Sequence, residues 1–123
     1  ARAVLEGLVF SYRQGLEELE ELSGKRAETV HVIGGGTKNT LLCRMIADGT
    51  GRNVRAGASE PAVFGNIGMQ ALATGQIGSL DELQGIVRNS VSAAVYAPKK
   101  PAEWDRNYAE MKKYIQGKRR YEI

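Results

Sequence analysis

The sequence predicts an α/β fold with two short strands and about five helices. Helical periodicity covers most of the chain, and only two short runs rich in β-branched or apolar residues have the pattern of buried strands. The 15 glycines among 123 residues exceed the usual share of roughly 7% and predict many tight turns. An isolated pair of strands is only marginally stable. We therefore expect the sheet to be completed by strands outside this sequence, either upstream in a longer protein or in a partner.

The first third of the chain has the pattern of a helix followed by a strand. Apolar residues recur at helical spacing over residues 1–22, opposite a charged face, and Gly24 is placed to end this helix. A β-branched run then predicts a strand over residues 29–33. Three glycines follow the strand directly, which is how a buried strand ends in a sharp turn.

The second helix begins after this glycine turn. Either Thr37 or Asn39 can cap its first turn, and Gly49 and Gly51 are placed to close it. Its apolar stripe consists of Leu41, Leu42, Met45 and Ile46. A second strand is expected over residues 53–56.

Three more helices are predicted in the second half of the chain. Pro61 suits the first position of one helix, and Ser79 with Glu82 forms a capping box for the next. The first of these carries small residues that allow close packing, namely Ala62, Gly65, Gly68 and Ala71. A proline-stiffened connection over residues 97–101 leads to a last helix, which Gly117 is expected to end. Its apolar stripe is Trp104, Tyr108, Met111 and Ile115.

Composition narrows the class of protein. No apolar run approaches the roughly 20 residues of a membrane span, and the first residues lack the pattern of a signal peptide, so we expect a protein that does not enter a membrane. The single cysteine, Cys43, excludes an internal disulfide and fits a reducing compartment, for which the cytoplasm is the simplest interpretation.

The net charge of +3 comes largely from basic residues near the end of the chain. They are Lys112, Lys113, Lys118, Arg119 and Arg120. A basic tail can attach to nucleic-acid phosphates, but no aromatic residues are interleaved to stack on bases. We therefore interpret the tail as a solvated terminus and expect no nucleic-acid partner.

The segment of residues 31–40 carries the most chemical information. Glycines without Cβ atoms let a flat or charged ligand lie against the backbone, and the start of a helix favours negative charge. Asn39 offers an amide that can donate and accept, as an adenine edge or a ribose requires. The same pattern also serves packing alone. A dinucleotide fingerprint and a P-loop are both excluded, because Asn39 replaces the third glycine of the former and the Gly-Lys-Ser/Thr ending of the latter is missing.

The run from His31 to Asn39, continued by residues 40–42 and 46–51, resembles the adenosine-binding segment of the FGGY carbohydrate kinases. Glu60 and the Gly-Asn-Ile-Gly-Met-Gln run of residues 65–70 resemble the pattern that sets rhamnulokinases apart within that family. Residues 3–8 resemble the helix that follows the family's second signature region. The proline of Ser59-Glu60-Pro61 and the pair Cys43-Arg44 depart from the family's pattern.

The resemblance implies that residues 1–123 are the C-terminal portion of an ATP-binding domain with the RNase H-like, actin-like ATPase fold. Gly34, Gly35, Gly36, Thr37 and Asn39 are then expected to bind the nucleotide. The longer protein is expected to transfer the γ-phosphate of ATP to a ketose hydroxyl, rhamnulose being the leading substrate, and the present chain alone to be inactive. ATP and Mg²⁺ are implied as cofactors, while the catalytic aspartate, the metal site and most of the sugar pocket are expected upstream. A homo-oligomer is possible.

Several other residues could be proposed for chemistry, and each has a structural explanation. Asp48, Asp81 and Asp105 fall at helix ends or on polar faces, where capping and solvation explain them. Glu60 could cap a helix or touch a neighbouring loop. We interpret His31 as a packed or edge residue, Cys43 as a small buried hydrophobe and Trp104 as an anchor of the last helix.

Three rival functions remain open at this point. One is another FGGY kinase, acting on xylulose, fuculose or glycerol. Another is a nucleotide-binding module without catalysis. The third is a nucleic-acid-binding domain that uses the basic tail, which predicts steeply salt-dependent affinity.

Overall fold

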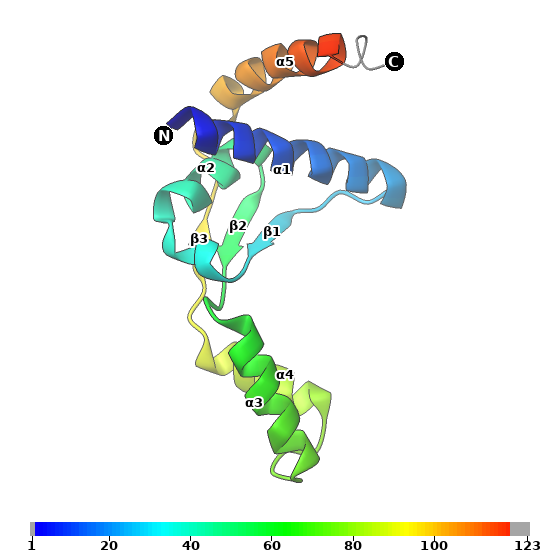
Figure 1. Cartoon of the computed structure of the whole chain (residues 1–123), viewed down its shortest axis with the longest axis vertical. Helices are drawn as coiled ribbons and strands as arrows, with labels where there is room; N and C mark the ends of the chain where they lie inside the picture. Colours follow the sequence, from blue (N-terminus) through cyan, green and yellow to red (C-terminus); the bar gives the residue numbers. More distant parts are fainter. Residues whose placement is uncertain (1, 119–123) are drawn as a thin grey trace.

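The structure, a computed structural model, describes residues 2–118, with side chains as far as residue 115. Five α-helices, one 3-10 helix and three strands make up this part of the chain (Figure 1). Their order is α1 (Arg2–Ser23), β1 (Thr29–Val32), η1 (Gly35–Lys38), α2 (Thr40–Thr50), β2 (Asn53–Ala56), α3 (Pro61–Ala73), α4 (Leu80–Ser90), β3 (Ala94–Tyr96) and α5 (Pro101–Lys118).

The predicted α/β fold and the five helices are confirmed, but the prediction of only two strands is wrong. β3 is a third strand of three residues, which pairs antiparallel with β2. A run this short has too little periodicity to predict a strand, and its pairing depends on a neighbour about 40 positions earlier. The expected end of the last helix at Gly117 is also wrong, because α5 continues to Lys118. Arg119 and Arg120 lie outside the described residues.

Within residues 2–118 the helices cover one face of the sheet and leave the other face exposed. β1 runs parallel to β2, and the strand order is β1-β2-β3, so β1 forms an edge of the sheet within the described residues. Val54 and Ala56 of β2 are buried under the helices, as the alternation of a half-covered strand requires. On the other face His31, Arg55 and Val95 are exposed, and the register places them side by side across the three strands.

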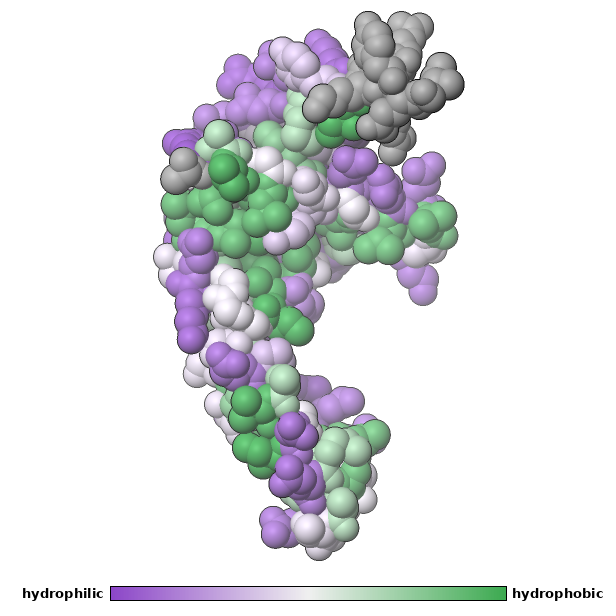
Figure 2. Space-filling view, viewed as in Figure 1, coloured by the Kyte–Doolittle hydropathy of each residue, from purple (hydrophilic) through white to green (hydrophobic). Residues whose placement is uncertain are grey.

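The chain divides into a body and a hairpin. The body consists of α1, α2, α5 and the sheet, and the hairpin consists of α3 and α4, which extend away from it (Figure 1). Pro61 begins α3 as predicted. The predicted capping box is present at α4, where Ser79 Oγ accepts from the Glu82 N–H at 3.1 Å and Glu82 Oε2 accepts from the Gly78 N–H at 2.8 Å. Hydrophobic residues are visible along the outside of the hairpin in the lower part of Figure 2.

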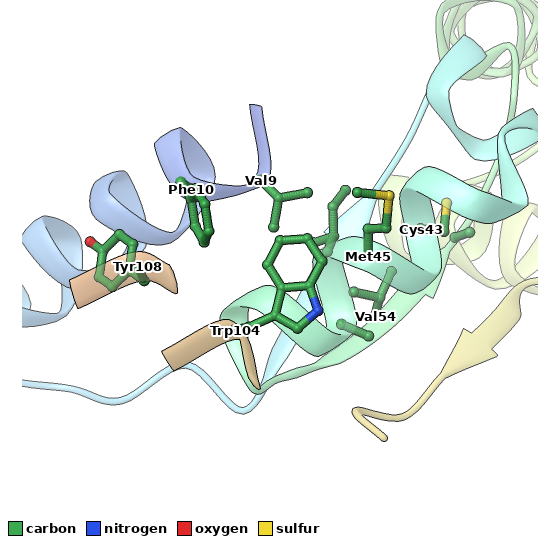
Figure 3. Packing of buried hydrophobic residues seen from close by; sticks show 10 residues of the cluster. Val9, Phe10, Cys43, Met45, Val54, Trp104 and Tyr108 are labelled. Atoms are coloured by element: carbon green, nitrogen blue, oxygen red, sulfur yellow. The ribbon is translucent and has the colours of Figure 1, made fainter. Parts of the chain in front are cut away.

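The core of the body lies where α1 crosses α2 and where α5 covers the crossing (Figure 3). Val9 and Trp104 close over Gly49, where even a single Cβ atom would collide with the Val9 side chain and press on the Trp104 ring. Trp104 also packs edge to face on Phe10, with ring centroids 5.5 Å apart. Its predicted role as the anchor of the last helix is confirmed.

A charged network holds α5 on α1 at the rim of this core. Arg13 pairs with Asp105 at 2.7 Å, and Glu17 accepts hydrogen bonds from the Tyr108 hydroxyl at 2.9 Å and from Lys112 at 2.8 Å. Burial would raise the pKa of Glu17, but the hydrogen bonds from Lys112, Tyr108 and Arg13 outweigh it and lower this pKa. Burial and the adjacent Glu17 carboxylate together raise the pKa of Tyr108 to about 12.

None of the helices in the described part of the chain has both the length and the apolar character that crossing a lipid bilayer requires.

Candidate functional site

The glycine turn lies at the carboxyl end of β1, at the edge of the sheet where open α/β folds bind ligands. Gly34 has φ 81° and ψ −162°, a conformation that is essentially restricted to glycine. This position therefore needs glycine for its backbone. The turn then enters η1 and, one residue later, α2.

Backbone hydrogen bonds tie the turn to the loop that follows β2. The Gly34 N–H donates to the Ala58 carbonyl at 2.8 Å, and the Gly57 N–H donates to the Val32 carbonyl at 2.8 Å. We call this pair of bonds the clasp. Residues 57 and 58 were not predicted as part of the site, because a contact made through backbone atoms leaves no side-chain signal in the sequence. The two loops are therefore joined directly to each other.

Thr37 and Asn39 both use side-chain atoms within the turn. The Thr37 hydroxyl donates to the Gly34 carbonyl at 2.7 Å, so Thr37 stabilises the turn and is not the cap of α2. Asn39 is that cap, and its Oδ1 accepts from the Leu42 N–H at 3.0 Å. Because a backbone N–H can only donate, the atom facing it must be the oxygen. The amide nitrogen of Asn39 has no partner among the hydrogen bonds of the described residues.

Gly35 and Gly36 differ from Gly34 in what they require. Neither has a positive φ, and a Cβ added at Gly35 would meet nothing within 4 Å. At Gly36 it would meet only Val32 Cγ1, at an ordinary 3.8 Å. The fold itself therefore does not demand glycine at either position, and both residues are exposed. Their N–H groups have no partner in the turn and loop hydrogen bonds of the described residues.

Cys43 contacts the turn from the first turn of α2. Its side chain is buried, its Sγ donates to the Gly36 carbonyl at 3.7 Å, and burial raises the pKa of the thiol. A buried thiol with a raised pKa is a poor nucleophile, which confirms that Cys43 is a packed residue.

The other candidates take the structural roles expected of them, with one exception. Asp48 accepts from the N–H groups of Lys99 and Lys100 ahead of α5, Asp105 pairs with Arg13, and Asp81 lies exposed in the first turn of α4. The suggestion that Glu60 caps α3 is wrong, because its side chain makes no capping hydrogen bond. Nowhere in residues 2–118 do three His, Cys, Asp or Glu side chains gather in a way that could hold a metal ion.

A hollow of about 650 Å³ lies between α1 and the open edge of β1 and reaches Gly36. Its walls are mainly apolar and include Tyr12, Leu16, Leu19, Val30 and Val32. Periodicity alone assigns the α1 residues of this set to a core, yet Leu19 is 65% exposed. The apolar side of α1 therefore extends beyond what the described residues cover.

Comparison with known proteins gives consistent matches. Residues 1–74 match the FGGY family of carbohydrate kinases, C-terminal domain. A rhamnulokinase of Bacteroides thetaiotaomicron is 37% identical over 93% of this chain and 24% of its own length. Rhamnulokinases of Oceanobacillus iheyensis and Klebsiella pneumoniae subsp. pneumoniae are 38% and 34% identical, over 79% and 89% of this chain. The chain spans less than a quarter of the length of these curated relatives.

Proposed function

The chain belongs to the FGGY family of carbohydrate kinases, and from this premise we propose that it supplies the adenosine-binding part of a longer, ATP-dependent sugar kinase. Rhamnulose is the proposed acceptor, because the relatives described above are named rhamnulokinases. We also propose a cytoplasmic location, which the free cysteine Cys43 fits.

The observation that carries this proposal is the open surface of Gly35 and Gly36. Glycine is present there although neither the backbone conformation nor packing within the described residues requires it, which is expected where a ligand lies against the backbone. Two free N–H groups can donate to an anionic or polar group of the nucleotide. ATP then supplies the γ-phosphate, and this segment binds and orients the nucleotide.

Asn39 has a divided role in this proposal. Its Oδ1 is engaged by the Leu42 N–H, so only its NH₂ group remains for a ligand. The nucleotide must therefore present a hydrogen-bond acceptor to Asn39, such as a ring nitrogen or a ribose oxygen.

The remaining catalytic groups are proposed to lie elsewhere in the full-length protein. Phosphoryl transfer requires a base for the sugar hydroxyl and groups that hold the phosphates and Mg²⁺. The acidic side chains of the described residues are dispersed or paired with cations, and they do not fit a Mg²⁺ site. We expect the short chain by itself to transfer no phosphate.

The sheet also supports a contribution from upstream residues. α1 and α2 pack together on the covered face of the sheet, and α2 connects β1 to its parallel neighbour β2. Parallel crossovers are right-handed in about 98% of cases, so crossovers on one face step in one direction. A strand ahead of α1 would therefore lie on the open side of β1, beneath the uncovered apolar residues of α1. We propose that upstream strands complete the sheet there.

Calorimetric titration of the full-length protein with ATP and ADP tests the adenosine site. Gly35→Val should abolish binding without unfolding the protein, because the added side chain enters open space. Gly85→Val is the matched control, since Gly85 lies on α4, away from the turn, and the space beside it is also open. Unchanged binding in Gly35→Val would contradict the proposal.

Two substitutions at Asn39 separate its capping role from its ligand role. Asn39→Asp preserves the cap but removes the donor, so the free energy of unfolding should stay near wild type while the affinity for ATP falls on the order of tenfold. Asn39→Ala should lose both. Full affinity in Asn39→Asp would show that the NH₂ group makes no contact with the nucleotide.

The sugar is tested by phosphorylation of a panel. Rhamnulose should give the highest kcat/KM among rhamnulose, xylulose, fuculose and glycerol. Nucleotide binding without transfer to any sugar would favour the alternative of a non-catalytic nucleotide-binding module.

A further inference from the structure

Helix α3 is apolar on nearly all sides although much of it is exposed. Only Asn66 and Gln70 among its 13 residues are polar. Helices of this composition are normally buried all round. Yet Val63, Ile67 and Met69 are 52%, 61% and 53% exposed.

Only one side of α3 has a partner in the described part of the chain. Gly68 lies against Leu83 of α4, so closely that a Cβ atom at Gly68 would collide with the Leu83 side chain. The opposite side faces outward where the hairpin extends away from the body, with hydrophobic residues along it (Figures 1 and 2). The free side of α3, defined by Val63 and Ile67, which lie one turn apart, therefore lacks cover within the described residues.

The hairpin begins next to the glycine turn, although the two are far apart in the sequence. Its first connection is the loop of residues 57–60, which the clasp ties to Gly34 and Val32 by two backbone bonds of 2.8 Å. One short, hydrogen-bonded loop thus connects the start of α3 to the candidate nucleotide site.

We propose that the free side of α3 docks onto the part of the full-length kinase that lies outside this chain, an inference that rests on the proposed function. The chain spans less than a quarter of the relatives' length, so a much larger body of protein remains to contact it. A 13-residue helix is about 20 Å long and about 10 Å wide, so the surface it offers is near 200 Å². This area is far below the roughly 800 Å² per partner of a stable complex between separate proteins.

Covalent connection removes this limitation. Within one chain the two surfaces meet at an effective concentration in the millimolar range, at which a small apolar contact is sufficient. We therefore take the docking partner to be another part of the same polypeptide. The loop of residues 57–60 would then connect this contact to Gly34.

Cysteine labelling of the full-length protein tests this docking. Ile67→Cys should react with a maleimide on the order of tenfold more slowly than Asn89→Cys, an exposed control position on α4, because reaction requires the contact to open. Peptide mass spectrometry locates each modified site, and Cys43 is buried. Val63→Cys provides a second probe of the same surface if Ile67→Cys does not fold.

Equal labelling rates at positions 67 and 89 in the folded, monomeric protein would overturn the proposal. Protection that appears only as the protein concentration rises would also overturn it, because the partner would then be a second copy. ATP binding, measured separately on the same protein, tests the proposed function. Protection without ATP binding would leave the docking in place and remove the adenosine site.

Discussion

The body and the hairpin contain similar helices but very different packing. α2 in the body has six buried residues, whereas α3 has one and α4 has none. Both parts have well-formed caps, at Asn39 and at Ser79. Caps and propensity therefore decide where a helix begins, while tertiary packing supplies most of its stability. We expect substitutions in the core of the body to cause the largest losses in the free energy of unfolding. In the hairpin we expect smaller losses, which come mainly from changes to caps and helix propensity.

Truncation of Trp104 should have the largest effect. Trp104→Ala removes the ring that packs on Phe10 and Gly49, and we expect a loss of about 3–5 kcal/mol in the free energy of unfolding. Denaturant titration followed by circular dichroism measures this loss. A cost below about 1 kcal/mol would mean that α5 contributes little to the body.

The same substitution at two glycines compares the two parts directly. Gly49→Ala should cost about 1–3 kcal/mol, because its Cβ atom would meet Val9 and Trp104 in a filled core. In Gly68→Ala the added Cβ atom meets only the side chain of Leu83, which can move. The better helix propensity of alanine contributes about 1 kcal/mol of stability, which offsets the cost of this contact. Its net effect should therefore be near zero. Equal losses in the two variants would show that the hairpin is packed as rigidly as the body.

Alkaline pH should weaken the body through Tyr108. Its pKa is raised to about 12, so the folded state favours the protonated phenol more than the unfolded state does. The stability from this group is complete below pH about 10 and is lost as the pH rises through about 12. Thermal melts between pH 8 and 12 should show a smaller decline in Tyr108→Phe than in wild type. The same decline in both proteins would assign it to other groups.

The most local effect should come from the cap of α4. Ser79→Ala removes the acceptor for the Glu82 N–H and should cost about 1 kcal/mol, confined to the hairpin. Hydrogen exchange should accelerate in residues 80–90 while the amides of α2 keep their protection. Faster exchange in α2 as well would show that the hairpin and the body unfold together.

Local signals predicted most of the helices, because proline, glycine and capping residues act within a few positions. Pro61 and Ser79 both begin helices where the sequence places them. β3 was not predicted, since three residues carry too little pattern and the strand forms only against β2. Sequence alone also allowed either Thr37 or Asn39 as the cap, and the structure selects Asn39 because Thr37 turns back to Gly34.

The sequence identified the three glycines and Asn39 as the candidate site, but it did not show that these residues have different structural roles. The backbone conformation at Gly34 requires glycine, whereas Gly35 and Gly36 leave open space beside them. The sequence alone cannot distinguish these roles, because all three residues are glycine. The clasp to Ala58 was missed because it uses only backbone atoms. The nucleotide-binding role of these residues remains a prediction.

Asp48 has a consequence for the order in which this chain folds. The carboxylate that receives the N–H groups of Lys99 and Lys100 stands on α2, so the start of α5 is defined by a residue made some 50 positions earlier. During synthesis α2 leaves the ribosome before α5, because synthesis proceeds from the N-terminus. The acceptor for the first residues of the last helix is therefore synthesised before that helix. We expect the docking of α5 onto α2 to be a late step in folding.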